Sequence, residues 1–147
     1  MEVDVRSVLI VDDEPRIREI LVRWLAPAGY DVKEAPDADA ALAAVAATAP
    51  DVVLCDVQMP GHDGLWLVEQ LRLSFPAVAI VLATANASVP PVVSMQGGVV
   101  EYLIKPFERE LVLAAVSHAA DWHEAAVARH AGRSPTDPVD EWLDRKR

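Results

Sequence analysis

Short apolar runs alternate with amphipathic segments along most of the chain. The runs are rich in Val, Ile and Leu, which is typical of strands covered on both faces of a sheet. They predict five strands, at residues 8–12, 31–35, 51–56, 79–84 and 100–105. The intervening apolar residues recur at three- and four-residue steps, which predicts helices near residues 15–25, 37–48 and 64–75, and a last helix from Glu108.

Strands that alternate with helices predict an α/β fold. Right-handed crossovers then give a doubly wound, five-stranded parallel sheet with helices on both faces. Turn residues fall between the segments. Pro15 suits a first helical turn, Pro27 and Gly29 end that helix, and Asp37 and Asp63 are expected to cap the next two helices.

Length, charge and cysteine content narrow the class of protein. The 147 residues suffice for one domain of ordinary size. A formal net charge of −10 argues against direct nucleic acid binding by this segment, because binding requires Lys and Arg to neutralise phosphates. No apolar run approaches the roughly 20 residues of a membrane span. The single Cys55, which we expect to be buried in a strand, fits a cytoplasmic protein without disulfides.

Polar residues stand at the ends of four of the five expected strands. Asp12 and Asp13 end the first, Asp56 the third, Thr84 the fourth and Lys105 the fifth. Parallel strands share one carboxyl edge, and ligands of open α/β sheets bind there. An Asp after a single strand is commonly a helix cap or a turn residue. The joint pattern favours a site in which three carboxylates, a hydroxyl and an amine converge.

Three neighbouring carboxylates repel one another unless a cation compensates their charge. Mg²⁺ suits such a site, since it binds a few carboxylates together with waters and phosphate oxygens. One carboxylate also offers a nucleophile that forms an acyl phosphate. Lys105 and Thr84 would then supply a positive charge and a hydrogen bond to the transferring phosphoryl group.

Four segments carry a resemblance to a known family: VLIVDDEP, DVVLCDVQMPGHDG, VLAT and YLIKPF. Together, in this order and spacing, they resemble the receiver domain of bacterial two-component response regulators over about residues 7–120. The resemblance implies a flavodoxin-like sheet with strand order 2-1-3-4-5. We therefore expect a receiver domain at residues 1–120 and a C-terminal helical extension with a linker or tail at residues 121–147.

The resemblance also implies a metal site and a phosphoacceptor. Asp56 would accept the phosphoryl group. Asp13 and Asp56 would bind Mg²⁺ directly, together with the main-chain carbonyl of Gln58, and Asp12 would help to hold the ion through water. The phosphodonor would be a sensor histidine kinase or a phosphotransfer protein. The domain would catalyse its own phosphorylation and dephosphorylation, and would signal by changing conformation.

Further residues match the family's switch. Lys105 would contact the phosphoryl group, Thr84 would move toward it, and Tyr102 would swing inward as Thr84 moves. The peptide bond before Pro106 is expected to be cis, as in the family. Gln58 and Asn86 would border the path of the attacking water and tune hydrolysis; the plain alternative is two solvated loop residues.

Two other functions are weighed against this one. A phosphatase of the haloacid dehalogenase type also uses an aspartyl phosphate, but it needs a second Asp where this chain has Gln58, and no cap domain is present. A degenerate receiver could act as a constitutive interaction module. The complete set of site residues argues against that alternative, whereas an unusual fourth helix supports it.

The fourth and last helices depart from the family pattern. The stretch SVPPVVSMQGG contains Pro90 and Pro91 and is one residue short, which predicts a short fourth helix. The last helix should run past Ala120 to Gly132, because nothing breaks it. We expect it to act as a connector or as the contact of a homodimer with Trp122 exposed. The alternative is a helix that frays, or that folds back so that Trp122 or Trp142 packs on its own domain.

Overall fold

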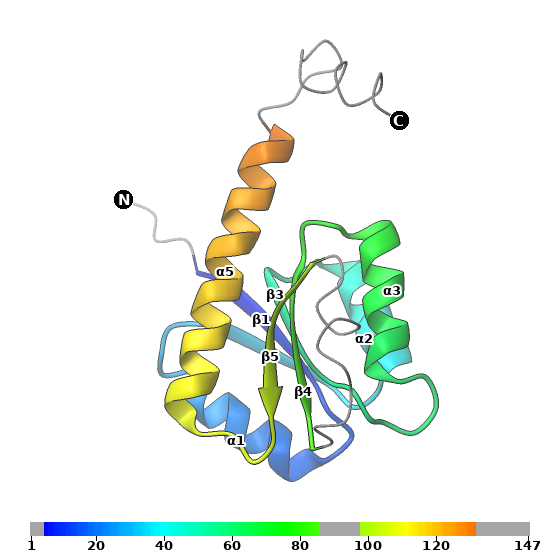
Figure 1. The fold of residues 1–147 in the computed structure, drawn as a ribbon, viewed down its shortest axis with the longest axis vertical. Coiled ribbons are helices and arrows are strands. Elements are labelled where there is room, and N and C mark those ends of the chain that lie inside the picture. Colours follow the sequence, from blue (N-terminus) through cyan, green and yellow to red (C-terminus); the bar gives the residue numbers. More distant parts are fainter. Residues whose placement is uncertain (1–4, 86–97, 132–147) are drawn as a thin grey trace.

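The computed structural model describes residues 5–85 and 98–131. Five parallel strands form one sheet in the order β2-β1-β3-β4-β5, which confirms the predicted doubly wound, flavodoxin-like fold (Figure 1). The strands are β1 (Ser7–Val11), β2 (Asp31–Ala35), β3 (Val52–Asp56), β4 (Ala79–Thr84) and β5 (Val99–Ile104). The helices are α1 (Pro15–Leu25), α2 (Ala38–Ala47), α3 (Gly64–Ser74) and α5 (Arg109–Ala131).

Each face of the sheet has its own apolar core. Helices α2 and α3 pack on one face, where Val45 and Leu67 meet alternate strand residues such as Val53. Helices α1 and α5 cover the other face, where Leu25 and Val116 are fully buried. Residues of β3 and β4 are buried on both sides, which explains why these two strands are continuous apolar runs.

The predicted helix starts are confirmed in their local chemistry. Pro15 lies in the first turn of α1. Asp37 caps α2 by accepting a hydrogen bond from the Ala40 amide at 2.7 Å, and Asp63 caps α3 by accepting one from the Trp66 amide at 2.9 Å. These caps satisfy amides that have no partner within their own helix. The expected fourth helix falls on residues 86–97, which lie outside the described residues.

Helix α5 continues past Ala120 as predicted and ends at Ala131. At 1.5 Å per residue its 23 residues span about 34 Å, and Figure 1 shows it rising well beyond the sheet. Trp122 is half-buried and packs against the core on the α1 and α5 side. This position agrees with the alternative in which Trp122 covers its own domain, so the expectation that its side chain is left uncovered is wrong.

Candidate functional site

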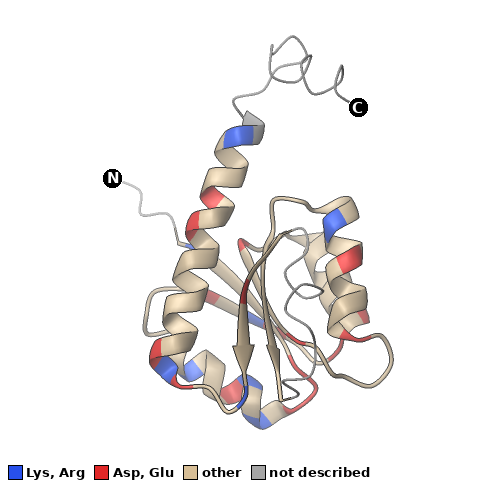
Figure 2. Cartoon of the chain, viewed as in Figure 1, with Lys and Arg blue, Asp and Glu red and all other residues tan. Residues whose placement is uncertain are grey.

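Four strands deliver polar residues to the carboxyl edge of the sheet. Asp12 follows β1, Asp56 and Thr84 are the last residues of β3 and β4, and Lys105 follows β5. Figure 2 shows acidic and basic positions gathered at the lower end of the molecule, where the strands end. We call Asp12, Asp13, Asp56, Thr84 and Lys105 the carboxyl rim. The structure therefore brings together residues that the sequence places up to 93 positions apart.

Lys105 connects two of the carboxylates. Its ammonium Nζ lies 2.8 Å from Oδ2 of Asp12 and 3.5 Å from Oδ2 of Asp56. Both carboxylates are buried, with 2% and 6% of Asp12 and Asp56 exposed, whereas Asp13 is exposed. Lys105 thus supplies the only charge compensation that the described residues show for two buried anions, and removal of it would leave both anions unpaired.

Burial changes the acid–base behaviour of the rim. Burial raises the pKa of Asp56 above its ordinary value of 3.8, Lys105 opposes the rise, and the charge of Asp12 adds to it. Burial alone would lower the pKa of Lys105, but hydrogen bonding and charge from Asp12 and Asp56 outweigh it, so that the pKa lies above 10.5. Lys105 is therefore cationic at neutral pH, while burial disfavours the ionised form of Asp56.

The loops around the rim fix the orientation of its carboxylates. Oδ1 of Asp12 accepts a hydrogen bond from the Glu14 amide at 2.9 Å, and Oδ1 of Asp56 accepts one from the Gln58 amide at 3.3 Å. The side chain of Gln58 itself is exposed. The Lys105–Pro106 peptide bond is cis, which confirms the expectation from the resemblance.

The donor set of the rim fits a divalent cation. Asp12, Asp13 and Asp56 each offer a carboxylate oxygen, and these oxygens all lie within 4.8 Å of one another. Ligands on opposite sides of an octahedral Mg²⁺ are about 4.2 Å apart, so small side-chain movements suffice for all three oxygens to surround one ion. Two of the three donors are buried anions, and a hard cation compensates such charges best.

Of the two expected switch residues, Thr84 belongs to the rim and Tyr102 lies on the neighbouring strand β5. Thr84 is fully buried, and its carbonyl accepts a hydrogen bond from the Lys105 amide at 2.7 Å. Tyr102 is half-buried in β5, in register with Leu82 of β4 and packed against the core beneath α2 and α3. Thr84 therefore lies at the site itself, and Tyr102 lies on β5, the strand that leads to Lys105. Asn86 lies outside the described residues.

Two contributors to the site were not expected from the sequence. Arg18 of α1 donates a hydrogen bond to the main-chain carbonyl of Asp12 at 2.6 Å and pairs with Glu34 at 3.1 Å. Gly64 begins α3 so close to β3 that a Cβ there would lie 2.4 Å from the carbonyl oxygen of Asp56. The glycine after Asp63 was a usable signal, because Gly in a helix start suits close backbone approach. Arg18 carried no comparable sequence signal beyond its position in α1.

An apolar hollow adjoins the rim on its outer side. It has a volume of about 310 Å³ between α1 and the segment after β5. Its wall is formed by Ile17, Ile20, Trp24, Ala85, Lys105, Pro106 and Phe107. Trp24 and Phe107 meet edge to face, with ring centroids 6.4 Å apart, and Ile20 is 40% exposed. Trp24 therefore packs on its own domain, yet the packing leaves a hollow beside Lys105.

The sequence similarity to curated relatives extends over most of this chain. The DNA-binding transcriptional regulator NtrC of Salmonella typhimurium is 37% identical over 118 residues, which cover 80% of this chain and 25% of NtrC. The transcriptional regulatory protein AruR of Pseudomonas aeruginosa is 35% identical over 152 aligned positions, which cover 97% of this chain and 62% of AruR. The chain thus spans between a quarter and about three fifths of the length of these relatives.

A solved structure and a family model give the same assignment. The response regulator TrrA of Thermotoga maritima, solved in complex with Mg²⁺–BeF, superposes with a TM-score of 0.72 at 30% identity, covering 78% of this chain and 99% of TrrA. In the described residues no helix is both long enough and apolar enough to span a membrane. The model of the response regulator receiver domain matches residues 8–117. The chain therefore belongs to the receiver domain family of response regulators.

Proposed function

We propose that this receiver domain accepts a phosphoryl group on Asp56 from a sensor histidine kinase or a phosphotransfer protein, and that it signals by a change of conformation. One observation carries the proposal. Asp56 is a buried carboxylate within reach of the Lys105 ammonium and of two further carboxylates, at the end of a strand that is otherwise apolar. Such a cluster costs stability, and a phosphoryl-transfer site gives a reason for its presence.

The transfer follows from the groups at the rim. An Asp56 oxygen attacks the phosphorus of a phosphohistidine, the new oxygen–phosphorus bond forms as the nitrogen–phosphorus bond breaks, and the imidazole leaves with the electron pair and takes a proton from water. Asp12, Asp13, Asp56 and the main-chain carbonyl of Gln58 would hold Mg²⁺. The ion supplies positive charge to the transferring group when bound. Lys105 would pair with a phosphoryl oxygen.

Thr84 and Tyr102 would transmit the change. We propose that the hydroxyl of Thr84 moves toward the new phosphoryl oxygens and that Tyr102 moves inward. The burial of Thr84 at the end of β4 and the half-buried position of Tyr102 on the neighbouring strand support this step. Gln58 and Asn86 would then set the lifetime of the acyl phosphate by orienting or blocking the attacking water, so that the protein acts as a signalling phosphoacceptor rather than a turnover enzyme.

The hollow beside Lys105 supports docking of the phosphodonor protein. A donor that reaches Asp56 must cover the carboxyl rim, and the exposed Ile20 and the half-buried Trp24 and Phe107 offer apolar contacts next to it. We propose a cytoplasmic location for such an exchange. We also propose a receiver unit at residues 1–120, an extension at residues 121–147 and a homodimer through α5. We propose no direct nucleic acid binding by this segment.

Intact-mass measurement with a small phosphodonor such as acetyl phosphate tests the site. The wild type should gain one phosphoryl group with Mg²⁺ and none with EDTA. Asp56→Asn should abolish the gain. Asp63→Asn is a matched control seven residues away in the same loop region and should leave it unchanged. Labelling of Asp56→Asn at the wild-type rate would refute the assignment. A wild type that never labels would favour the constitutive interaction module.

A further inference from the structure

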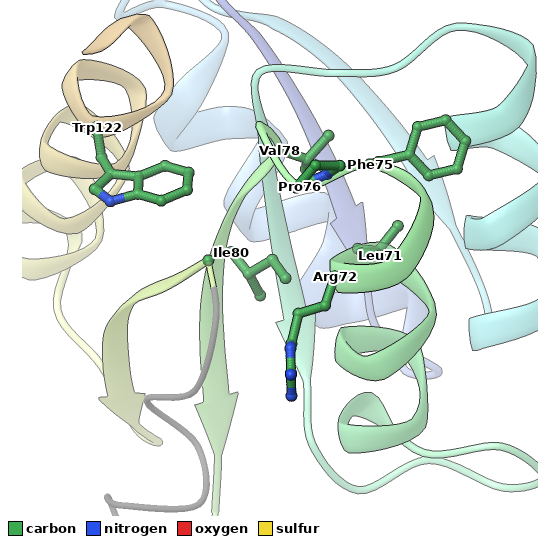
Figure 3. A pocket seen from close by; sticks show the side chains of 8 residues that line it. Leu71, Arg72, Phe75, Pro76, Val78, Ile80 and Trp122 are labelled. Atoms are coloured by element: carbon green, nitrogen blue, oxygen red, sulfur yellow. The ribbon is translucent and has the colours of Figure 1, made fainter. Parts of the chain in front are cut away.

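An apolar groove lies at the end of the sheet opposite the carboxyl rim. It has a volume of about 560 Å³, and we call it the amino-end groove. Its larger apolar residues are Pro50, Phe75, Pro76, Val78 and Val127, and Asp51 and His123 form a polar part of its border. A smaller hollow of about 170 Å³ shares Phe75, Pro76 and Val78 with it and continues to Trp122. Figure 3 shows Trp122 reaching from α5 toward the start of β4, across from Leu71 and Arg72 on α3.

One wall of the groove comes from the part of α5 beyond the family match, which ends at residue 117. That part is fixed to the domain by polar contacts. Nδ1 of His123 lies 2.6 Å from the Ala77 carbonyl oxygen, and Nε2 lies 3.3 Å from Oδ1 of Asp51. Arg6 pairs with Asp121 at 3.0 Å and with Glu124 at 2.9 Å. The wall is therefore held in place, yet Val127 at its edge remains 44% exposed.

The chain itself supplies an occupant of matching chemistry. Residues 132–138, GRSPTDP, contain no large apolar residue, and the next residues are VDEWLD. Val139, Trp142 and Leu143 are the large apolar residues between 132 and 147, and their spacing of three and four would place them on one face of a helical turn. Three such residues are too few to form a core of their own, so they can be buried only against another surface.

The distance along the chain permits a return to the groove. Val127 is four residues before the end of α5, which corresponds to about 6 Å of helix. Val139 lies eight positions after Ala131, and such a segment reaches at most about 28 Å when extended. A link of this length keeps the local concentration of the segment near the millimolar range, which favours its own groove over that of a second molecule.

We propose that residues 139–143 dock in the amino-end groove of the same molecule, with Trp142 as the anchoring side chain. Aromatic anchors that fill apolar hollows dominate contacts of this size. The exposed Arg72 lines the adjoining hollow and offers a cation to Asp140 or Glu141 of the docked segment. The proposal concerns a surface away from Asp56, and it does not depend on phosphorylation.

The test compares the wild type with two variants of the full chain by NMR and hydrogen exchange. The Trp142 indole NH resonance, assigned by its loss in Trp142→Phe, should move to the position of a solvated indole in Val127→Asp. Leu73→Asp is the matched control, since Leu73 is 76% exposed and does not line the groove. In Trp142→Ser/Leu143→Ser, the amides of residues 75, 77–79 and 120–127 should exchange several-fold faster than in the wild type.

Three results would overturn the proposal. The first is an indole resonance that is the same in the wild type and in Val127→Asp. The second is unchanged exchange at the groove in the double variant. The third is a wild-type indole signal that shifts on dilution together with a dimer in sedimentation, which would show that a second copy fills the groove instead. Circular dichroism should confirm that Val127→Asp keeps the fold, since the residue lies near the end of α5.

Discussion

The two ends of the sheet are built from opposite kinds of residues. At the carboxyl rim, buried Asp12 and Asp56 share one cation, Lys105, and the backbone of α3 begins in direct contact with β3. At the amino end, Phe75 and Val78 face an open apolar groove whose polar contacts lie at its border. The rim holds closely packed backbone and unbalanced buried carboxylates, whereas the amino end holds an apolar groove whose charged neighbours, such as Asp51 and Arg6, are paired at its border.

This contrast shows which end of the sheet contains residues that lower the stability of the fold and which end does not. Buried like charges destabilise a domain, and proteins tolerate them at sites of function. An apolar groove lowers the stability of the fold only a little, but its exposed apolar surface favours the binding of a partner. We therefore expect substitutions at the rim to have large effects that depend on backbone and charge, and substitutions at the amino end to act locally.

The largest effect should come from Gly64→Ala. The added Cβ would lie 2.4 Å from the Asp56 carbonyl oxygen and 2.8 Å from Cα of Val57, and neither backbone atom yields easily. Overpacking of this kind costs about 3 kcal/mol of unfolding free energy. Chemical denaturation should show that loss, and phosphorylation of Asp56 should slow because β3 must shift.

Gly61→Ala is the matched control in the same loop. Gly61 has φ of 78°, but its added Cβ would meet nothing within 4 Å. The substitution should therefore cost only the left-handed backbone strain of about 1 kcal/mol. Equal losses of unfolding free energy in the two variants would show that backbone conformation, and not the contact of α3 with β3, determines the effect of substitutions in this part of the rim.

A smaller effect, opposite in sign, is expected from Asp56→Asn in metal-free buffer with EDTA. Burial raises the pKa of Asp56, so its folded form holds a proton more tightly than the unfolded chain does. Stability from this group is fully present below pH 3.8 and is lost as the pH rises through the folded-state pKa. Asn carries no charge and avoids that loss. The variant should melt a few degrees above the wild type at pH 7 and at the same temperature near pH 3.

The control is Asp63→Asn, since Asp63 is exposed and Asn also caps helices well. It should melt like the wild type at both pH values. A wild type that is more stable than Asp56→Asn at pH 7 would mean that the Lys105–Asp56 pair outweighs the burial of the carboxylate, and the contrast between the two ends of the sheet would lose its electrostatic basis.

The sequence predicted the fold and most of the rim because both depend on local patterns. An apolar run marks each strand regardless of its neighbours, and β4 was predicted at the residues where it occurs, Ala79–Thr84. Once the strands are known to be parallel, Asp12, Asp56 and Lys105 must share an edge. Their proximity also depends on the strand order 2-1-3-4-5, which the family resemblance implied, but it needed no knowledge of side-chain packing.

The features that were missed depend on how distant elements pack. The contact of Arg18 with Asp12 requires a particular rotation of α1 over the sheet. The cover of Trp122 requires the start of β4 and the turn at Gly98 to lie beneath α5, and a Cβ on Gly98 would lie 4.0 Å from the Trp122 ring. A helical pattern shows that one face is apolar, but it does not show what that face contacts.

The smallest effect, and the one most specific to the amino end, should come from His123→Ala. Its two ring nitrogens contact the Ala77 carbonyl oxygen and the Asp51 carboxylate, and so join α5 to the loops before β3 and β4. The core residues Val112 and Val116 lie earlier in the same helix and do not depend on these contacts. Loss of the imidazole should therefore open the end of α5 without much change in global stability. Hydrogen exchange should rise several-fold at residues 120–129 and stay constant at residues 112–117. His118→Ala is the control within the same helix, because its contact with Glu101, at 2.6 Å, is exposed. If His123→Ala instead lowered the melting temperature as much as Gly64→Ala, the amino end would be as tightly coupled to the core as the rim, and the comparison between them would fail.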